Sequence, residues 1–159
     1  MQKIAPFLWF DTQAEEAAEL YVSLFPDSRI DGVTRYGDAG PGVPGSVMVV
    51  SFTLGGQQFS AINGGPVYAF TPAVSFPVSC DDQDEVDRYW NALTADGGEP
   101  VQCGWLTDRF GLSWQIVPRR LGELLGDPDP ERVRRVTEAM LKMIKLEIAQ
   151  LERAADGEV

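Results

Sequence analysis

The sequence contains no histidine among its 159 residues. Without an imidazole, the chain cannot build a Ser-His-Asp triad, a Cys-His pair, a histidine-based zinc site or a histidine-based facial triad. It also lacks the side chain that ordinarily titrates near neutral pH. Any reaction would therefore have to use carboxylates, Tyr, Lys, Arg, Cys or backbone groups.

Cysteine and basic residues are also scarce. Cys80 and Cys103 are too few for a disulfide framework and lack the spacing of metal ligands, so we expect two reduced thiols and a cytoplasmic protein. The 13 basic and 24 acidic residues give a net charge of −11, which argues against binding to nucleic acid or an anionic membrane. No segment approaches the roughly 18 consecutive apolar residues of a membrane span. The N-terminal "MQKIAPFLWFD" is interpreted as a first strand and not as a signal peptide.

The apolar content of 44% is ordinary for a folded globular chain. In the first half, a helix is predicted to begin at Thr12, with Glu15 in the spacing of a capping box. Gly55-Gly56 is typical of a two-residue hairpin turn. Strands are predicted at 4–10, 29–36, 46–54 and 57–63, with a glycine- and proline-rich loop at 37–45.

The pattern starts again about 70 residues later. Residues 74–80 form a predicted strand, Asp82 and Glu85 repeat the cap spacing, and "VQC", "GWLTD" and "LSWQIV" follow the helix as short strands. Each half therefore has the order strand–helix–strand–strand–strand. One such unit cannot cover both faces of its sheet, so we expect the two units to pair and enclose a cavity.

The tail is predicted to be a separate amphipathic helix over about 130–154. Asp129 is its expected cap and Pro130 occupies the first helical position. Its apolar stripe favours packing onto a sheet or a second subunit. The pair Met140/Met143 as an adaptable partner-binding face is the alternative interpretation.

The segments "FLWFDTQAEEAAELYVSLFPDSRI", "RYGDAGPG", "FSAINGGP", "SFPVSCDDQDEVDRYWNAL" and "CGWLTDRFGLSWQIVP" together resemble the vicinal oxygen chelate (glyoxalase/bleomycin-resistance) superfamily. The resemblance is greatest to its PhnB-like branch, often labelled 3-demethylubiquinone-9 3-methyltransferase. It implies an α+β fold in which two βαβββ modules form a cupped mixed sheet around a pocket, usually in a homodimer. The expected domain spans 1–118, with modules at about 3–66 and 67–118, followed by the extension 119–159.

In metal-dependent relatives, inward residues on the first and last strand of each module bind a divalent metal. By resemblance, these places fall near Ala5, near 61–63, near Ser75 and at Gln115, where those relatives carry a Glu. An alanine, a neutral hydroxyl and an amide are poor ligands for a divalent cation. We therefore predict no metal and no cofactor.

The predicted pocket residues are mostly aromatic or uncharged: Phe7, Trp9, Asn63, Ser75, Trp105, Phe110 and Gln115. Trp9 could stack on a flat ligand, with its indole N–H as an orienting donor, or belong to the core. Asn63, before Gly64-Gly65, could instead cap a turn. Asp108-Arg109 is expected to be a surface pair, unless Arg109 faces the pocket and binds an anion.

These features favour a metal-free protein that binds, or acts weakly on, a small, partly aromatic molecule. One alternative is a metal-assisted enzyme whose unusual site includes Gln115, and another is an interaction protein with a closed pocket. A methyl-donor-dependent transferase is disfavoured, because the glycine-rich segment 37–45 joins two strands and no helix follows it.

Overall fold

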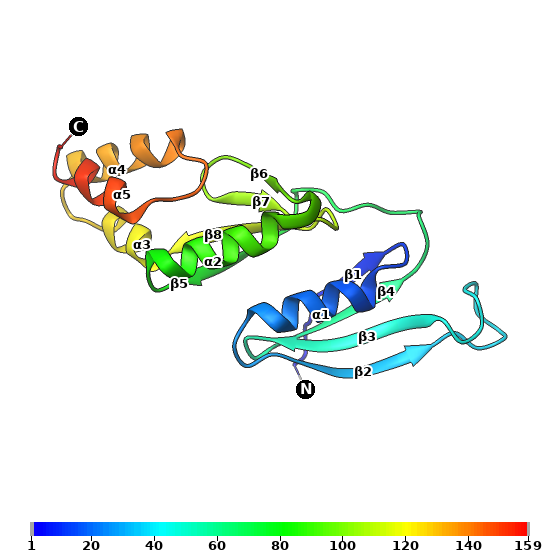
Figure 1. Ribbon diagram of the computed structural model, residues 1–159. Helices are drawn as coiled ribbons and strands as arrows, with labels where there is room; N and C mark the ends of the chain where they lie inside the picture. Colours follow the sequence, from blue (N-terminus) through cyan, green and yellow to red (C-terminus); the bar gives the residue numbers. More distant parts are fainter. Residues whose placement is uncertain (1, 159) are drawn as a thin grey trace. The chain divides into compact units, whose positions relative to one another are not determined.

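The computed structural model describes residues 2–158 and divides the chain into two compact units. The first ends at Phe70 and the second begins at Thr71. Each is described by itself below, with the elements labelled as in Figure 1.

The first unit is a four-stranded mixed sheet with one helix along one face (Figure 1). Its elements are β1 (Phe7–Phe10), α1 (Ala14–Leu24), β2 (Arg29–Arg35), β3 (Val47–Leu54) and β4 (Gln57–Asn63). The strand order is β1-β4-β3-β2, with β1 parallel to β4 and the other pairs antiparallel. The predicted hairpin turn is confirmed: Gly55 and Gly56 have φ of 54° and 83°, values that side-chain-bearing residues rarely adopt.

The core of this unit lies between α1 and one face of the sheet. Leu8 and Phe10 are buried on β1 while Phe7 and Trp9 are not, as expected when side chains alternate along a strand. On β3 and β4, the rings of Phe52 and Phe59 stack with centroids 5.4 Å apart. The opposite face of the sheet therefore carries Phe7 and Trp9 away from the helix.

Strand β2 is exposed along its whole length, and among residues 2–158 it pairs with β3 alone. Its register with β3 shifts twice, between Ile30 and Gly32 and between Thr34 and Arg35. The strand bends at such irregularities, and the regular ladder of hydrogen bonds is interrupted there.

The second unit repeats the first. It contains β5 (Ser75–Cys80), α2 (Gln83–Thr94), β6 (Glu99–Pro100), β7 (Trp105–Thr107) and β8 (Ser113–Pro118), with the strand order β5-β8-β7-β6. β5 is parallel to β8 and the other pairs are antiparallel. The expected fold class, two βαβββ modules with four-stranded mixed sheets and a C-terminal amphipathic helix, is confirmed.

The two helices begin differently, although the sequence predicts the same cap for both. At α2, Asp82 Oδ1 accepts the N–H of Glu85 at 2.9 Å, as expected. At α1, the predicted capping box of Thr12 and Glu15 is wrong: the helix begins at Ala14, and Gln13 at the cap position makes no side-chain cap bond. The Ala14 N–H is instead bound by Asn63 from β4, so one donor of the first turn finds its acceptor on a distant strand.

As far as residue 158, the tail forms three helices, α3 (Arg119–Leu125), α4 (Pro130–Lys142) and α5 (Ile148–Ala155). Asp129 caps α4 as predicted, accepting the N–H of Glu131 at 3.0 Å. The three helices share a buried cluster of apolar residues that also contacts Val117 of β8. The predicted single helix over 130–154 is wrong in its extent, and α3 was not predicted.

Long-range hydrogen bonds stabilise the non-helical segment between α4 and α5. Cys103 and Gly104 donate their N–H groups to the carbonyls of Met143 and Ile144, both at 2.8 Å. These bonds keep the carbonyls from serving as acceptors in a continuous helix. Lys145 binds Asp87 of α2 at 2.6 Å, and this hydrogen bond lowers the pKa of Asp87 and raises that of Lys145.

None of the helices between residues 2 and 158 is long and apolar enough to cross a membrane.

Candidate functional site

One face of the second sheet brings together three predicted pocket residues, Ser75, Trp105 and Gln115. Trp105 on β7 lies directly opposite Gln115 on β8 in the antiparallel register, so both side chains are on one face. Gln115 Nε2 donates to Ser75 Oγ on β5 at 2.9 Å. On the other face of β8, Trp114 and Ile116 are buried.

The Gln115–Ser75 pair is neutral and still has capacity for a ligand. Among residues 2–158, no group donates to Gln115 Oε1, and the Ser75 hydroxyl uses its oxygen as the acceptor for Gln115. A free carbonyl acceptor therefore lies on β8 across from Trp105, and a hydroxyl proton lies on β5, on the other side of β8. This set suits an aromatic molecule with a polar hydrogen-bonding group.

The turn between β7 and β8 is organised by Asp108, whose expected surface position is wrong. Its side chain is buried, and its carboxylate accepts the N–H groups of Phe110 and Leu112 at 2.9 and 3.1 Å and the indole N–H of Trp114 at 2.9 Å. Arg109 pairs with Asp96 at 3.2 Å and lies over the ring of Phe110. Asp108 thus shapes the turn that precedes the strand of Gln115.

In the first unit, Phe7 is 60% exposed and Trp9 is half-buried. The Trp9 indole N–H donates to the carbonyl of Gly65 at 2.9 Å, and the Tyr68 ring meets the indole edge-on at 5.0 Å. A Cβ on Gly64 would lie 2.2 Å from the indole, so only glycine fits there. The N–H that the sequence suggested as a donor to a ligand is therefore bonded within the protein.

Asn63 lies on the opposite face of the first sheet from Trp9. Its Oδ1 accepts the Ala14 N–H at 2.8 Å and its Nδ2 donates to the Val47 carbonyl at 3.2 Å. The hydroxyl of Tyr36 donates to the backbone carbonyl of Asn63 at 2.6 Å. Asn63 therefore joins the start of α1, the start of β3 and the loop after β2, and its own side-chain groups are engaged.

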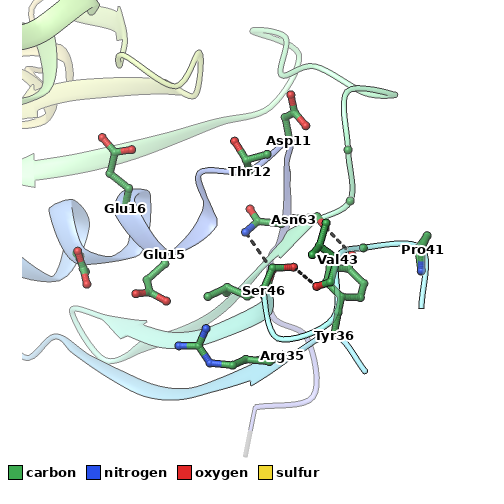
Figure 2. A pocket seen from close by; sticks show the side chains of 15 residues that line it. Asp11, Thr12, Glu15, Glu16, Arg35, Tyr36, Pro41, Val43, Ser46 and Asn63 are labelled. Carbon is green, nitrogen blue, oxygen red and sulfur yellow. Dashed lines mark hydrogen bonds between the residues drawn. The ribbon is translucent and has the colours of Figure 1, made fainter. Parts of the chain in front are cut away.

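Around Asn63 lies a hollow of about 680 Å³, which we call the α1 hollow (Figure 2). It is bounded by the start of α1, the end of β2, and the loop between β2 and β3. Of the seven predicted pocket residues, only Asn63 lines it. Its walls include four carboxylates (Asp11, Glu15, Glu16 and Glu19), one guanidinium (Arg35), and the apolar side chains of Pro41, Val43 and Val47.

Sequence reasoning missed this hollow because its parts come from three separate segments. The available signal was weak: Glu15 and Glu19 are four residues apart and share one helix face, and Tyr36 precedes a glycine-rich loop. Nothing local indicates that Tyr36 reaches Asn63, which lies 27 residues further along the chain.

The residues at the places expected for a metal do not fit a divalent cation. Gln115 and Ser75 are neutral and bonded to each other, Ala61 is fully buried, and Asn63 is engaged with α1 and β3. Over residues 2–158, no cluster of three or more His, Cys, Asp or Glu side chains is arranged to hold a metal ion.

The profile of the family described as 3-demethylubiquinone-9 3-methyltransferase matches residues 2–117. The chain belongs to this family. The PhnB protein from Bacillus cereus is 38% identical to it, and the match covers 74% of this chain and 99% of that one with a TM-score of 0.68. The resemblance to PhnB-like proteins is thereby confirmed.

More distant solved structures share the fold. Protein PA1353 from Pseudomonas aeruginosa is 22% identical, with a TM-score of 0.61 over 74% of this chain and 98% of that one. The fosfomycin resistance protein FosX from Listeria monocytogenes, solved with Mn(II) and sulfate, is 15% identical, with a TM-score of 0.51 over 79% of this chain and 97% of that one. No curated protein matches the chain.

Proposed function

We propose that this family member binds a small aromatic molecule carrying a hydroxyl or similar polar group, and does so without a divalent metal. The observation that carries the proposal is the Gln115–Ser75 hydrogen bond of 2.9 Å beside Trp105. The ring of the ligand stacks on or against Trp105, while its polar group donates to Gln115 Oε1 and accepts from the Ser75 hydroxyl. Phe7, Trp9, Asn63 and Phe110 stay predicted pocket residues.

Matched ligands and variants test this proposal. We expect 4-ethylphenol to raise the melting temperature, and ethylbenzene, which lacks the hydroxyl, to raise it less at equal concentration. Gln115→Leu removes the acceptor and should weaken 4-ethylphenol binding roughly tenfold. Gln102→Leu, an exposed glutamine outside the sheet face, serves as the control. Equal affinity in both variants would refute the assigned role of Gln115.

A metal-assisted site that includes Gln115 is the second candidate function. It is considered because the structure of FosX, which shares the fold, contains Mn(II). It requires that Gln115 Oε1 bind the ion, with substrate or water completing the coordination. Any ion that binds only the folded state must raise the melting temperature by mass action. We expect millimolar Mn²⁺ to produce no shift, and a saturable shift that Gln115→Leu abolishes would establish this alternative instead.

Methyl transfer is not part of the proposal. The glycine-rich segment 37–45 joins β2 to β3 and is not followed by a helix, whereas binding of a nucleotide-type methyl donor at a glycine-rich turn usually uses a strand-to-helix connection. Calorimetry with S-adenosylmethionine is expected to show no binding. Heat of binding that saturates at one donor per chain would reverse this conclusion.

From the family resemblance we further propose that the two modules within 1–118 act as one domain and that the protein is a homodimer. Light scattering on the purified protein measures the mass directly. Deletion of residues 119–159 tests whether the extension mediates assembly, as the interaction-protein alternative requires. An unchanged oligomeric state after that deletion would argue against an assembly role for the extension.

A further inference from the structure

We propose that the α1 hollow is a second ligand site, separate from the Trp105–Gln115 face, and that it binds a small aliphatic amino carboxylate. The ammonium group of this zwitterion binds Glu15 and its carboxylate binds Arg35. Figure 2 shows both side chains on the hollow, Glu15 extending from α1 and Arg35 from β2. The proposal rests on two opposite charges that share one hollow without pairing.

Glu15 is the first of these charges. Its Oε2 atom is buried and has no hydrogen-bond partner among residues 2–158. A buried carboxylate oxygen without a donor is unfavourable, because the water that bound it in the unfolded chain has not been replaced. Glu19 lies one turn further along α1, and the helix contains no basic residue that could compensate for either charge. Because Oε2 is closed to solvent, the ammonium group of the ligand contacts the other carboxylate oxygen, Oε1, and compensates the charge that both oxygens share.

Arg35 is the second charge. Its Nη1 donates to the carbonyl of Gly45 at 3.1 Å, which fixes the direction of the side chain. No carboxylate within residues 2–158 forms an ion pair with this guanidinium. Its remaining N–H groups are therefore available for a carboxylate, which guanidinium binds with two parallel hydrogen bonds.

The wall of the hollow formed by the loop between β2 and β3 is well defined. Tyr36 is buried, and a Cβ on Gly40 or Gly42 would lie 2.7 or 2.3 Å from its ring, so the loop packs closely on the tyrosine. The hydroxyl of Tyr36 is bonded to the Asn63 carbonyl at 2.6 Å. This arrangement presents Val43 and Val47 to the hollow as an apolar surface for the carbon chain of a ligand.

The repeat offers an internal comparison. In the second unit, only residues 101–104 join β6 to β7, whereas residues 36–46 join β2 to β3 in the first. The second unit thus has the same strands and helix but lacks the loop that makes the wall. The α1 hollow is an addition to the shared module and is not required by the fold.

The first experiment compares three probes of equal chain length: 6-aminohexanoate with both charges, hexanoate with the anion only, and hexylamine with the cation only. Binding to the full-length protein is followed by calorimetry and by amide chemical shifts. We expect 6-aminohexanoate to bind about tenfold more tightly than either single-charge probe and to shift amides around the hollow. No binding by 6-aminohexanoate, 4-aminobutanoate or 8-aminooctanoate at millimolar concentration would overturn the proposal. The proposal would also be overturned if hexylamine bound as tightly as 6-aminohexanoate. In that case the attraction of the carboxylates for an ammonium group would explain the binding without Arg35.

The second experiment assigns each charge to its residue. Glu15→Gln should weaken 6-aminohexanoate and hexylamine roughly tenfold and leave hexanoate unchanged, while Arg35→Gln should weaken 6-aminohexanoate and hexanoate instead. Asp84→Asn, an exposed acid in the first turn of α2, removes the same charge as Glu15→Gln at a place without a hollow and should change nothing. Gln115→Leu should also have no effect, which separates this site from the proposed aromatic site. Unchanged 6-aminohexanoate binding in both pocket variants would refute the assignment.

Discussion

Gln83 of α2 binds the backbone of the break in the C-terminal extension, at Leu146, and of the helix that follows it, at Ile148. Its side-chain oxygen accepts the Ile148 N–H at 2.8 Å, and its amide nitrogen donates to the Leu146 carbonyl at 3.1 Å. Leu146 itself is fully buried. The extension is therefore attached to the second βαβββ unit by a specific amide as well as by apolar contact.

We expect Gln83→Leu to destabilise the protein by about 1–3 kcal/mol, because one N–H and one carbonyl lose their partners in a largely buried place. Urea unfolding measures the change, and hydrogen exchange at Ile148 shows whether α5 loosens. Gln13→Leu is the matched control, since Gln13 is exposed and makes no side-chain cap bond. Equal loss in the two variants would show that the Gln83 bonds contribute nothing.

Asp108→Ala should be more damaging, because it leaves two backbone N–H groups and the Trp114 indole without their acceptor. Each buried donor left without an acceptor lowers the free energy of unfolding by about 1–3 kcal/mol. Asp108→Asn keeps one oxygen and should lose less. Asp96→Asn, at the exposed end of the Arg109 pair, should change stability by about 0–1 kcal/mol. Unfolding curves followed by tryptophan fluorescence distinguish these three variants.

Asn63→Ala removes the acceptor for the first N–H of α1, and losses of this kind cost about 0.5–2 kcal/mol. Asn63→Asp keeps an acceptor for Ala14, but it loses the donor to Val47 and adds a negative charge to an acidic hollow, so it should recover only part of that stability. Asn91→Ala, an exposed position on α2, is the control. If Asn63→Asp were as unstable as Asn63→Ala, the bond to Ala14 would not be the important one.

Burial raises the pKa of the Cys80 thiol to about 12, with the carboxylates of Glu85 and Asp81 adding to the effect. Because the folded pKa lies above the unfolded one, the thiol ionises first in the unfolded chain. The stability that the neutral Cys80 thiol contributes is fully present below about pH 9. Between pH 9 and 12 the free energy of unfolding falls, because of this thiol, by about 1.4 kcal/mol per pH unit. The free energy of unfolding of Cys80→Ala should decline less steeply with pH than that of the parent over this range, and an identical slope would contradict the shift.

At pH 8, iodoacetamide should label the half-buried Cys103 before the buried Cys80.

Much of the fold was predictable because the relevant signals are local. The Gly55-Gly56 turn, the Asp82 cap and the Pro130 start each depend on neighbours within four residues, and all three occur as expected. The break after Lys142 was not predictable, because no glycine or proline marks it and the bonds that hold it come from Cys103 and Gly104.

The site was predictable only in part, for the same reason. The burial pattern along β8 puts Gln115 on the face opposite the buried Trp114 and Ile116, and its place in a pocket stays a prediction from the resemblance. The hydrogen bonds that Trp9 donates to Gly65 and Asn63 donates to Val47 depend on how distant segments fold over the strands. The local sequence around either residue does not indicate them.

The irregular pairing of β2 has a consequence for solubility. A straight, uncharged outer strand would offer its free backbone groups to a neighbouring molecule and could start fibre growth. Here the ladder is interrupted twice, and Arg29, Asp31 and Arg35 line the strand with ionic groups. This outer strand of the first sheet is thereby a poor template, which protects a chain whose other strands are rich in valine and phenylalanine.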